Sequence, residues 1–200
     1  MSITNGYTTL QSVKHALGIP LDNHEDDGYL EATIESVSRM IENYTGRRFY
    51  TTIETRYYQA INSDEVMVDD LITVTTLKSD DDEDGTFETT WATSDYQLKP
   101  DNASTNGRPY TWIESSGYGN YSFPVKVKKG VQIAGPFGYC AITSLPKPVS
   151  EAAKLQSIRL FKRKDAPFGV IAGGELQQGM TMPELDPDVK MLLSAYVRRV

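Results

Sequence analysis

The chain has 200 residues, of which 39% are hydrophobic and 24% are charged, a balance typical of an ordered globular protein. One cysteine and two histidines exclude an intrachain disulfide and leave too few ligands for a structural zinc site, which takes about four. The net charge of −7 argues against binding nucleic acid on a broad basic surface. No apolar run approaches the roughly 18 residues of a membrane span. The N-terminal residues have neither a basic start nor an apolar stretch, so we expect no secretory signal. We therefore expect a product of the cytosol, or of an assembly built there.

The first fifty residues predict two helices. A threonine at position 8 or 9 caps the first, which Gly18 ends, and an aspartate at position 26 or 27 caps the second, which Gly46 ends. The second helix carries apolar residues at alternating spacings of four and three, which place them on one face. We interpret this stripe as core, with an oligomer seam as the alternative: Leu30, Ile34, Val37, Ile41 and Tyr44.

Residues 48–141 have a different pattern, rich in threonine, tyrosine and valine and interrupted by turn residues. An exposed hairpin tip is expected at Asp80–Gly85, and a turn near Lys128–Gly130 is expected to join the last two strands. We predict strands at Phe49–Ala60, Glu65–Val68, Ile72–Lys78, Glu88–Trp91, Tyr96–Leu98, Thr111–Ile113, Val125–Lys128 and Val131–Tyr139.

Helices return in the last quarter of the chain. Pro148 suits the first turn of a helix that stops near Asp165–Pro167, and the glycine-rich stretch 168–183 is predicted to be a mobile loop. Asp186 and Pro187 begin the terminal helix. Its apolar face consists of Val189, Leu192, Leu193, Tyr196, Val197 and Val200.

These elements predict an α+β fold in two parts. Residues 1–48 and 142–200 supply a four-helix core with two N-terminal and two C-terminal helices. Residues 49–141 supply a large antiparallel β insertion between the second and third helices. The pattern contains no internal repeat and no low-complexity tract.

Charge is distributed unevenly along the sequence. Residues 63–101 contain twelve acids against two lysines, whereas residues 147–164 contain six basic residues against Glu151. A solvated surface explains each charge singly, but opposite blocks in one chain suggest contact between neighbouring subunits. The acidic tip comprises Asp80, Asp81, Asp82, Glu83 and Asp84. The inter-subunit basic face comprises Lys154, Arg159, Lys162 and Arg163.

No motif predicts catalysis, so we expect no enzyme, no catalytic residue, no cofactor and no metal site. Asp80, Asp82, Asp84 and Gly85 match four positions of an EF-hand loop, but Trp91 stands where that loop needs a bidentate glutamate. A solvated hairpin tip is therefore favoured over weak divalent-ion binding.

Two further features are open to a functional or a structural interpretation. Cys140 follows an apolar strand, which favours a buried small hydrophobe over a reactive thiol. Aromatic residues could line a binding face, although sheet packing alone explains most of them. The candidates are Tyr57, Tyr58, Tyr110, Trp112, Tyr118 and Tyr121.

Four stretches carry a family resemblance in order along the chain. They are TLQSVKHALGI (9–19), DDGYLEATIESVSRMIENYTGRRF (26–49), GPFGY (135–139) followed by LPKPVSEAAKLQSIRLFKRKDAPFG (145–169), and DPDVKMLLSAYVRRV (186–200). Together they resemble the head–tail connector, or neck adaptor, proteins of tailed bacteriophages. The block at 78–123 is longer and more acidic than the helical core requires, so no role for it follows from the resemblance.

The resemblance implies a structural protein of the virion neck, assembled in the host cytoplasm as a ring of about twelve subunits beneath the portal. Such a ring extends the channel for DNA packaging and ejection and receives a stopper or tail-completion protein. DNA passes without sequence-specific binding, since an acidic lining repels phosphate, and no membrane is involved. The alternative is another virion decoration protein or a β-rich binding module.

Three surfaces follow as expectations from the resemblance and the charge pattern. The acidic tip faces the channel or a neighbouring neck protein, and the basic face contacts the next subunit. The terminal helix docks onto the portal, with packing against the second helix as the alternative. The residues of this docking helix are Val189, Leu192, Leu193, Tyr196, Arg198 and Arg199.

Overall fold

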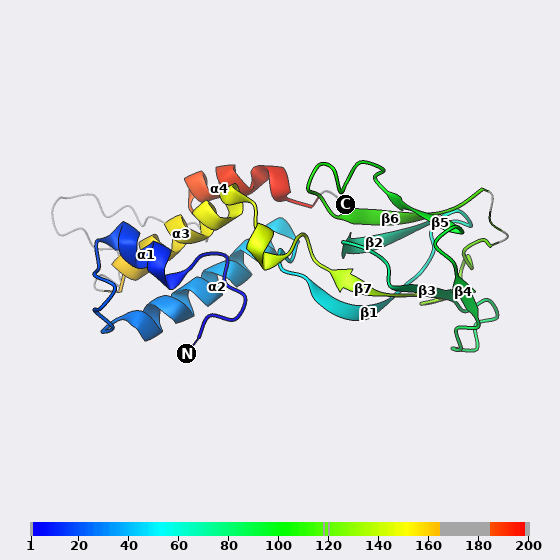
Figure 1. The fold of residues 1–200 in the computed structure, drawn as a ribbon, viewed down its shortest axis with the longest axis horizontal. Coiled ribbons are helices and arrows are strands. Elements are labelled where there is room, and N and C mark those ends of the chain that lie inside the picture. The colour runs from blue at the N-terminus through cyan, green and yellow to red at the C-terminus, as the bar shows by residue number, and fades with distance from the viewer. Residues whose placement is uncertain (1, 118, 120, 165–184, 199–200) are drawn as a thin grey trace, which may run out of the picture. The chain divides into compact units, whose positions relative to one another are not determined.

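The computed structural model describes residues 2–117, 119, 121–164 and 185–198. In this part of the chain, two helices precede a run of seven strands and two helices follow it (Figure 1). Residues 1–47 with 145–200 form one compact unit, the helical unit, and residues 48–144 form another, the β unit. The predicted α+β class is confirmed, with an antiparallel β insertion between the second and third helices. The predicted loop at 168–183 lies outside the described residues.

The first two helices begin and end where the sequence predicts. α1 (Leu10–Leu17) follows Thr9, whose hydroxyl accepts a hydrogen bond from a backbone N–H of the first turn (3.1 Å). This cap satisfies a donor that the helix itself leaves free. α2 (Asp27–Thr45) comes next. Gly18 and Gly46 end the two helices in the left-handed conformation, which glycine adopts without a Cβ penalty.

The helical unit is packed around α3 (Lys147–Lys162), which contacts the other three described helices (Figure 1). The apolar stripe of α2 is part of this core, and each fully buried side chain of that size contributes roughly 1.5–3 kcal/mol. Its members at 0% exposure are Leu30, Ile34, Val37 and Ile41. The stripe is therefore core rather than an open seam. No helix in the described part of the chain is long and apolar enough to cross a membrane.

α4 (Pro187–Leu193) is shorter than the predicted terminal helix. Asp186 caps it as predicted, because its side chain accepts a hydrogen bond from a backbone N–H of the first turn (3.0 Å). The chain then tightens into a 3-10 turn over Ser194–Tyr196. α4 packs mainly on α3, and this corrects the alternative that placed it on the second helix. At the start of α4, Asp186 is bound to Gln156 and Arg159 of α3.

The β unit is an antiparallel half-barrel (Figure 1). Its strands are β1 (Thr52–Tyr58), β2 (Glu65–Leu71), β3 (Thr76–Ser79), β4 (Thr89–Trp91), β5 (Tyr96–Lys99), β6 (Tyr110–Ser115) and β7 (Val131–Phe137). The order is β4-β3-β7-β2-β6-β5, and β1 pairs with β7 outside this path. Alternate residues of β7 are buried, as a strand with one face on a core requires. They join the buried residues of the other strands in one apolar core.

The strand predicted at 125–128 does not form. This segment makes only an isolated bridge between Ala60 and Val125. Lys126 and Lys129 have positive φ angles of 75° and 58°, which break an extended backbone. The prediction was wrong because lysine carries no signal for this conformation, unlike glycine or asparagine. The predicted turn therefore does not join two strands, and β7 pairs with β1, β2 and β3 instead.

Candidate functional site

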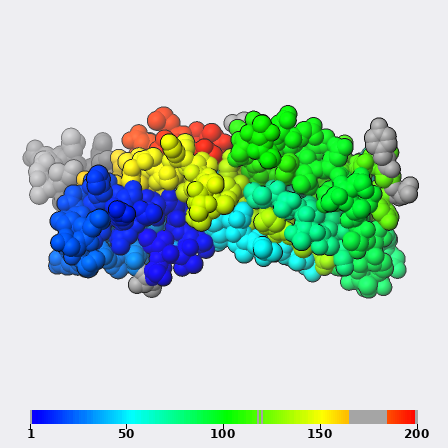
Figure 2. Space-filling view, in the orientation of Figure 1, coloured from blue at the N-terminus to red at the C-terminus, as the bar shows by residue number. Residues whose placement is uncertain are grey.

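The predicted docking helix is divided between core and surface. Val189 and Leu193 are 0% exposed, so they pack inside the helical unit and present no docking surface. Leu192 and Tyr196 are half-buried. Met191, which the sequence analysis left out, is 70% exposed. The space-filling view shows α4, in red, beside α3, in yellow, on the surface of this unit (Figure 2).

The two arginines predicted to assist docking follow the 3-10 turn. Arg198 is half-buried, and its backbone N–H donates to the carbonyl of Thr45 at the end of α2 (2.8 Å). Arg199 lies outside the described residues. The C-terminal segment of the helical unit thus contacts α2 as well as α3. These contacts fix the position at which Met191, Leu192 and Tyr196 reach the surface.

The four basic residues of α3 do not form one free face. Lys154 pairs with Glu151 one turn earlier (2.7 Å), and Arg159 pairs with Asp186. Within the described ranges, Lys162 and Arg163 have no ion-pair partner; Lys162 is exposed and Arg163 is half-buried. These two cations at the C-terminal end of α3 are the members of the predicted basic face without an ion pair in the described part of the chain.

The acidic tip closes the hairpin between β3 and β4. Asp80 is only 4% exposed, because its carboxylate accepts hydrogen bonds from the backbone N–H groups of Glu83 (2.8 Å) and Gly85 (2.9 Å). It therefore shapes the tip and does not project from it. The other four acids, at positions 81–84, are exposed as predicted.

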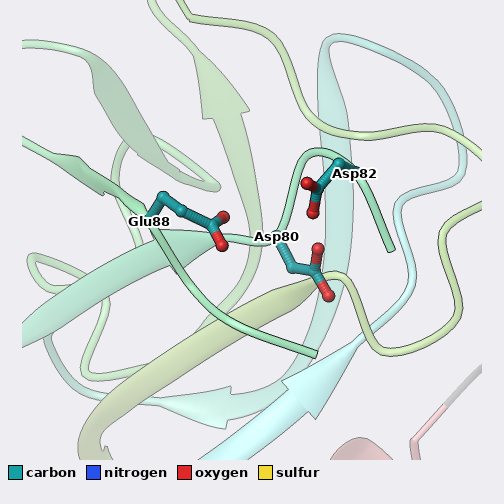
Figure 3. A group of neighbouring side chains, drawn as sticks. All are labelled: Asp80, Asp82 and Glu88. Carbon is teal, nitrogen blue, oxygen red and sulfur yellow. The ribbon is translucent and has the colours of Figure 1, made fainter. Parts of the chain in front are cut away.

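Three carboxylates gather at the base of this tip (Figure 3). Asp80, Asp82 and Glu88 each offer an oxygen, and these atoms lie within 4.8 Å of one another. Carboxylate oxygens are ligands for Ca²⁺, but both oxygens of Asp80 already accept backbone N–H groups. The flanking elements are strands, so the loop is not an EF-hand.

A polar network that the sequence analysis missed lies on the β unit. Glu54 accepts hydrogen bonds from Arg48 (2.6 Å) and Arg56 (2.8 Å). Arg56 also binds Asp69 (2.7 Å), which in turn accepts a hydrogen bond from the hydroxyl of Tyr58 (3.2 Å). The alternation of positions 54, 56 and 58 on β1 places these side chains on one face. The network joins β1 to β2.

The network shifts the pKa values of its members. Burial would raise the pKa of Glu54, but the hydrogen bonds from Arg48 and Arg56 outweigh it and hold that pKa below its ordinary value. Burial, followed by the charge of Asp69, raises the pKa of Tyr58 to about 12. Glu54 is therefore charged and Tyr58 is protonated at neutral pH, as a structural ion-pair network requires.

The lowered pKa of Glu54 predicts acid sensitivity of the β unit. Its stabilising effect is fully present above the ordinary value of 4.5 and is lost as the pH falls through the lower folded value. Urea unfolding followed by tryptophan fluorescence between pH 7 and 3 measures this. We expect a steeper loss of stability below pH 4.5 in the wild type than in Glu54→Gln. Equal slopes for both proteins contradict the prediction.

Cys140 is expected to be a poorly reactive thiol. It is half-buried, and its Sγ contacts the carbonyl oxygen of Phe49 (3.3 Å). Burial raises the pKa of Cys140 to about 11, and only the thiolate is the nucleophile. We expect modification by a disulfide reagent at pH 8 to be at least about tenfold slower than in the urea-unfolded chain. Equal rates in the two states contradict this expectation.

The predicted aromatic face is dispersed. Tyr57 is 48% exposed on β1, Trp112 is 45% exposed on β6 and Tyr121 is 43% exposed near the buried Trp91. Tyr58 and Tyr110 are half-buried, and Tyr118 lies outside the described residues. The described aromatic side chains therefore do not form one shared binding face. Trp112 lines a pocket, which is described below.

Residues 7–90 match the family model of the "Phage gp6-like head-tail connector protein". The match begins just before α1 and reaches β4, so it includes the stretches 9–19 and 26–49, two of those that carry the resemblance. The resemblance to connector proteins is confirmed, and a connector family is structural rather than enzymatic.

Solved structures show a likeness of fold over the full length of the chain. A chain in the "Neck of empty GTA particle computed with C6 symmetry" has a TM-score of 0.60 and 18% identity, with 100% of this chain and 94% of that chain covered. A chain in the "Neck of native GTA particle computed with C12 symmetry" has a TM-score of 0.54 and 20% identity, with 96% and 93% covered.

A third chain, in the "Virion of native gene transfer agent (GTA) particle", has a TM-score of 0.58 and 17% identity, with 100% of this chain and 94% of that chain covered. At these identities the likeness is one of fold. It includes the β unit, for which the sequence resemblance implied no role. No curated protein matches the chain.

Proposed function

We propose that the protein is a head–tail connector located in the virion neck of a tailed phage or phage-like particle. The family match over residues 7–90 supports this proposal. Its principal support is the full-length fold likeness to neck chains, which includes both units. Because one of those necks was computed with C12 symmetry, we propose a ring of about twelve subunits.

The ring surrounds the channel through which DNA is packaged and ejected, and its role is mechanical. A chain with a net charge of −7 repels phosphate, so DNA slides without sequence-specific binding. The exposed acids at 81–84 face the channel or a neighbouring neck protein in this proposal. Neither a cofactor nor a metal ion has a part in it.

The portal binds the exposed edge of the C-terminal segment. Met191, Leu192 and Tyr196 supply apolar contacts, and Arg198 lies beside them in sequence. Because Val189 and Leu193 hold α4 against the helical unit, this surface is rigid before it meets the portal. A rigid surface binds with less loss of conformational entropy than a segment that folds on binding. A stopper or tail-completion protein binds elsewhere on the ring.

Light scattering of the purified protein, alone and mixed with its portal protein, tests the proposal. Negative-stain imaging of any large species then shows whether it is a ring. We expect either a ring of about twelve subunits or a monomer that joins only the portal complex. A monomer or trimer that ignores the portal contradicts the proposal and favours a decoration or binding module.

A further inference from the structure

The outer face of β2, β6 and β5 contains a pocket of about 300 Å³. Antiparallel pairing sets Glu65 of β2 opposite Glu114 of β6, and Trp112 of β6 opposite Lys99 of β5. These four side chains and Pro100 line the pocket. The pocket lies wholly within the β unit, so its shape depends on one set of strand registers.

The pocket has an unbalanced negative charge. Like charges directly opposite each other on neighbouring strands destabilise a sheet, and Glu65 and Glu114 form such a pair. Lys99 compensates Glu114 (3.1 Å) but also binds Asp101 (2.8 Å). Glu65 has no ion-pair partner in the described ranges. The pair therefore costs stability in the isolated chain and leaves a carboxylate suited to an incoming cation.

The same pocket offers an aromatic surface to that cation. Trp112 is 45% exposed, and its cross-strand neighbour Met67 is 39% exposed. A guanidinium group stacks on an indole ring more favourably than on any other side-chain ring, and its planar donors also suit carboxylates. An exposed tryptophan beside an uncompensated glutamate is thus a combination that fits an arginine.

We propose that this pocket binds the last turn of α3, with its Lys162 and Arg163, from a second copy of the chain. Both cations lack an ion-pair partner in the described ranges, and Lys162 is exposed. A pocket on one unit and its complement on the other make a contact between unlike surfaces, which closes rings. The inference rests on the proposed ring and identifies one contact within it.

Two complementary charge reversals test the contact. Glu65→Lys places a positive charge in the pocket, and Lys162→Glu with Arg163→Glu reverses the last turn of α3. Each variant alone is expected to weaken ring formation by roughly tenfold or more. In an equal mixture, alternating subunits bring every reversed pocket to a reversed helix and every native pocket to a native helix. The mixture is therefore expected to recover wild-type assembly.

The single-variant measurements include two controls. Glu25→Lys matches the charge change of Glu65→Lys, and Lys128→Glu with Lys129→Glu matches that of the double helix variant. These control positions are exposed and lie outside the contact, so both controls are expected to assemble like the wild type. Thermal unfolding of Glu65→Lys checks folding, and its midpoint is expected to stay equal or rise because the like-charge pair is removed.

The outcomes separate this inference from the proposed function. Variants that form rings as readily as the wild type overturn the contact and leave the connector role intact. Variants that fail singly and stay inactive when mixed also overturn it, and they favour a segment of another neck protein or a contact within one chain. A wild-type chain that forms no ring, alone or on the portal, overturns both.

Discussion

Replacing Gly138 with alanine is expected to lower the free energy of unfolding of the β unit by about 2–4 kcal/mol. Gly138 follows β7 with a φ angle of 140°, and a Cβ built there lies 2.1 Å from the carbonyl oxygen of Tyr50. The obstruction is backbone, so no side-chain rotation relieves it. Urea unfolding followed by tryptophan fluorescence measures the loss, because both tryptophans belong to the β unit.

Gly107→Ala is the matched control for this substitution. Gly107 also has a left-handed φ angle, 61°, but a Cβ there meets nothing within 4 Å. Gly107→Ala should therefore lower the free energy of unfolding only by the cost of the left-handed conformation, about 1 kcal/mol. Similar losses for the two variants contradict the close approach of Gly138 to Tyr50.

The close approach of Gly138 to Tyr50 explains a glycine motif whose structural role could not be predicted from the sequence. GPFGY at 135–139 contributed to the resemblance to connector proteins. A Cβ at Gly135 lies 2.4 Å from the carbonyl oxygen of Thr73, so both glycines of the motif are required by backbone that passes close to them. Thr73 and Tyr50 are far away in sequence, and only the strand pairing brings them near. A local pattern cannot predict such a requirement.

Local signals predicted the elements well where the chemistry of single residues decides the outcome. Thr9, Gly18, Gly46 and Asp186 act as helix ends because of a hydroxyl, a missing Cβ or a carboxylate. The early end of α4 had no such signal, since the apolar periodicity continues through Tyr196 while the backbone tightens. Tertiary anchoring overrides periodicity there.

The candidate surfaces were harder to predict than the fold. The charge blocks were visible in the sequence, but partners such as Asp186 for Arg159 were not. Likewise, the alternation of Glu54 and Arg56 on β1 indicates a shared face, whereas their link through Asp69 depends on where β2 lies. The register between β2 and β6 also places Glu65 opposite Glu114. The interactions of surface residues therefore depend on long-range pairing, whereas the formation of the core follows largely from local apolar patterns.

We expect Leu193→Ala to destabilise the helical unit and Met191→Asp to leave its stability almost unchanged. Leu193 is 0% exposed, so its truncation should cost the helical unit about 2–4 kcal/mol through lost burial and a cavity. Met191 is 70% exposed, so its replacement should change stability by less than about 0.5 kcal/mol. Urea unfolding followed by far-UV circular dichroism at a helical wavelength reports on this unit, which contains all four described α-helices.

Portal binding is expected to reverse this ranking. Met191→Asp places a charge in the proposed apolar contact, and it should weaken binding to the portal by roughly tenfold or more while the chain stays folded. Under conditions where Leu193→Ala remains folded, that variant should still bind, since its side chain does not reach the surface. If Met191→Asp binds the portal like the wild type, the docking surface does not include α4, and α4 is then only a structural helix that completes the core around α3.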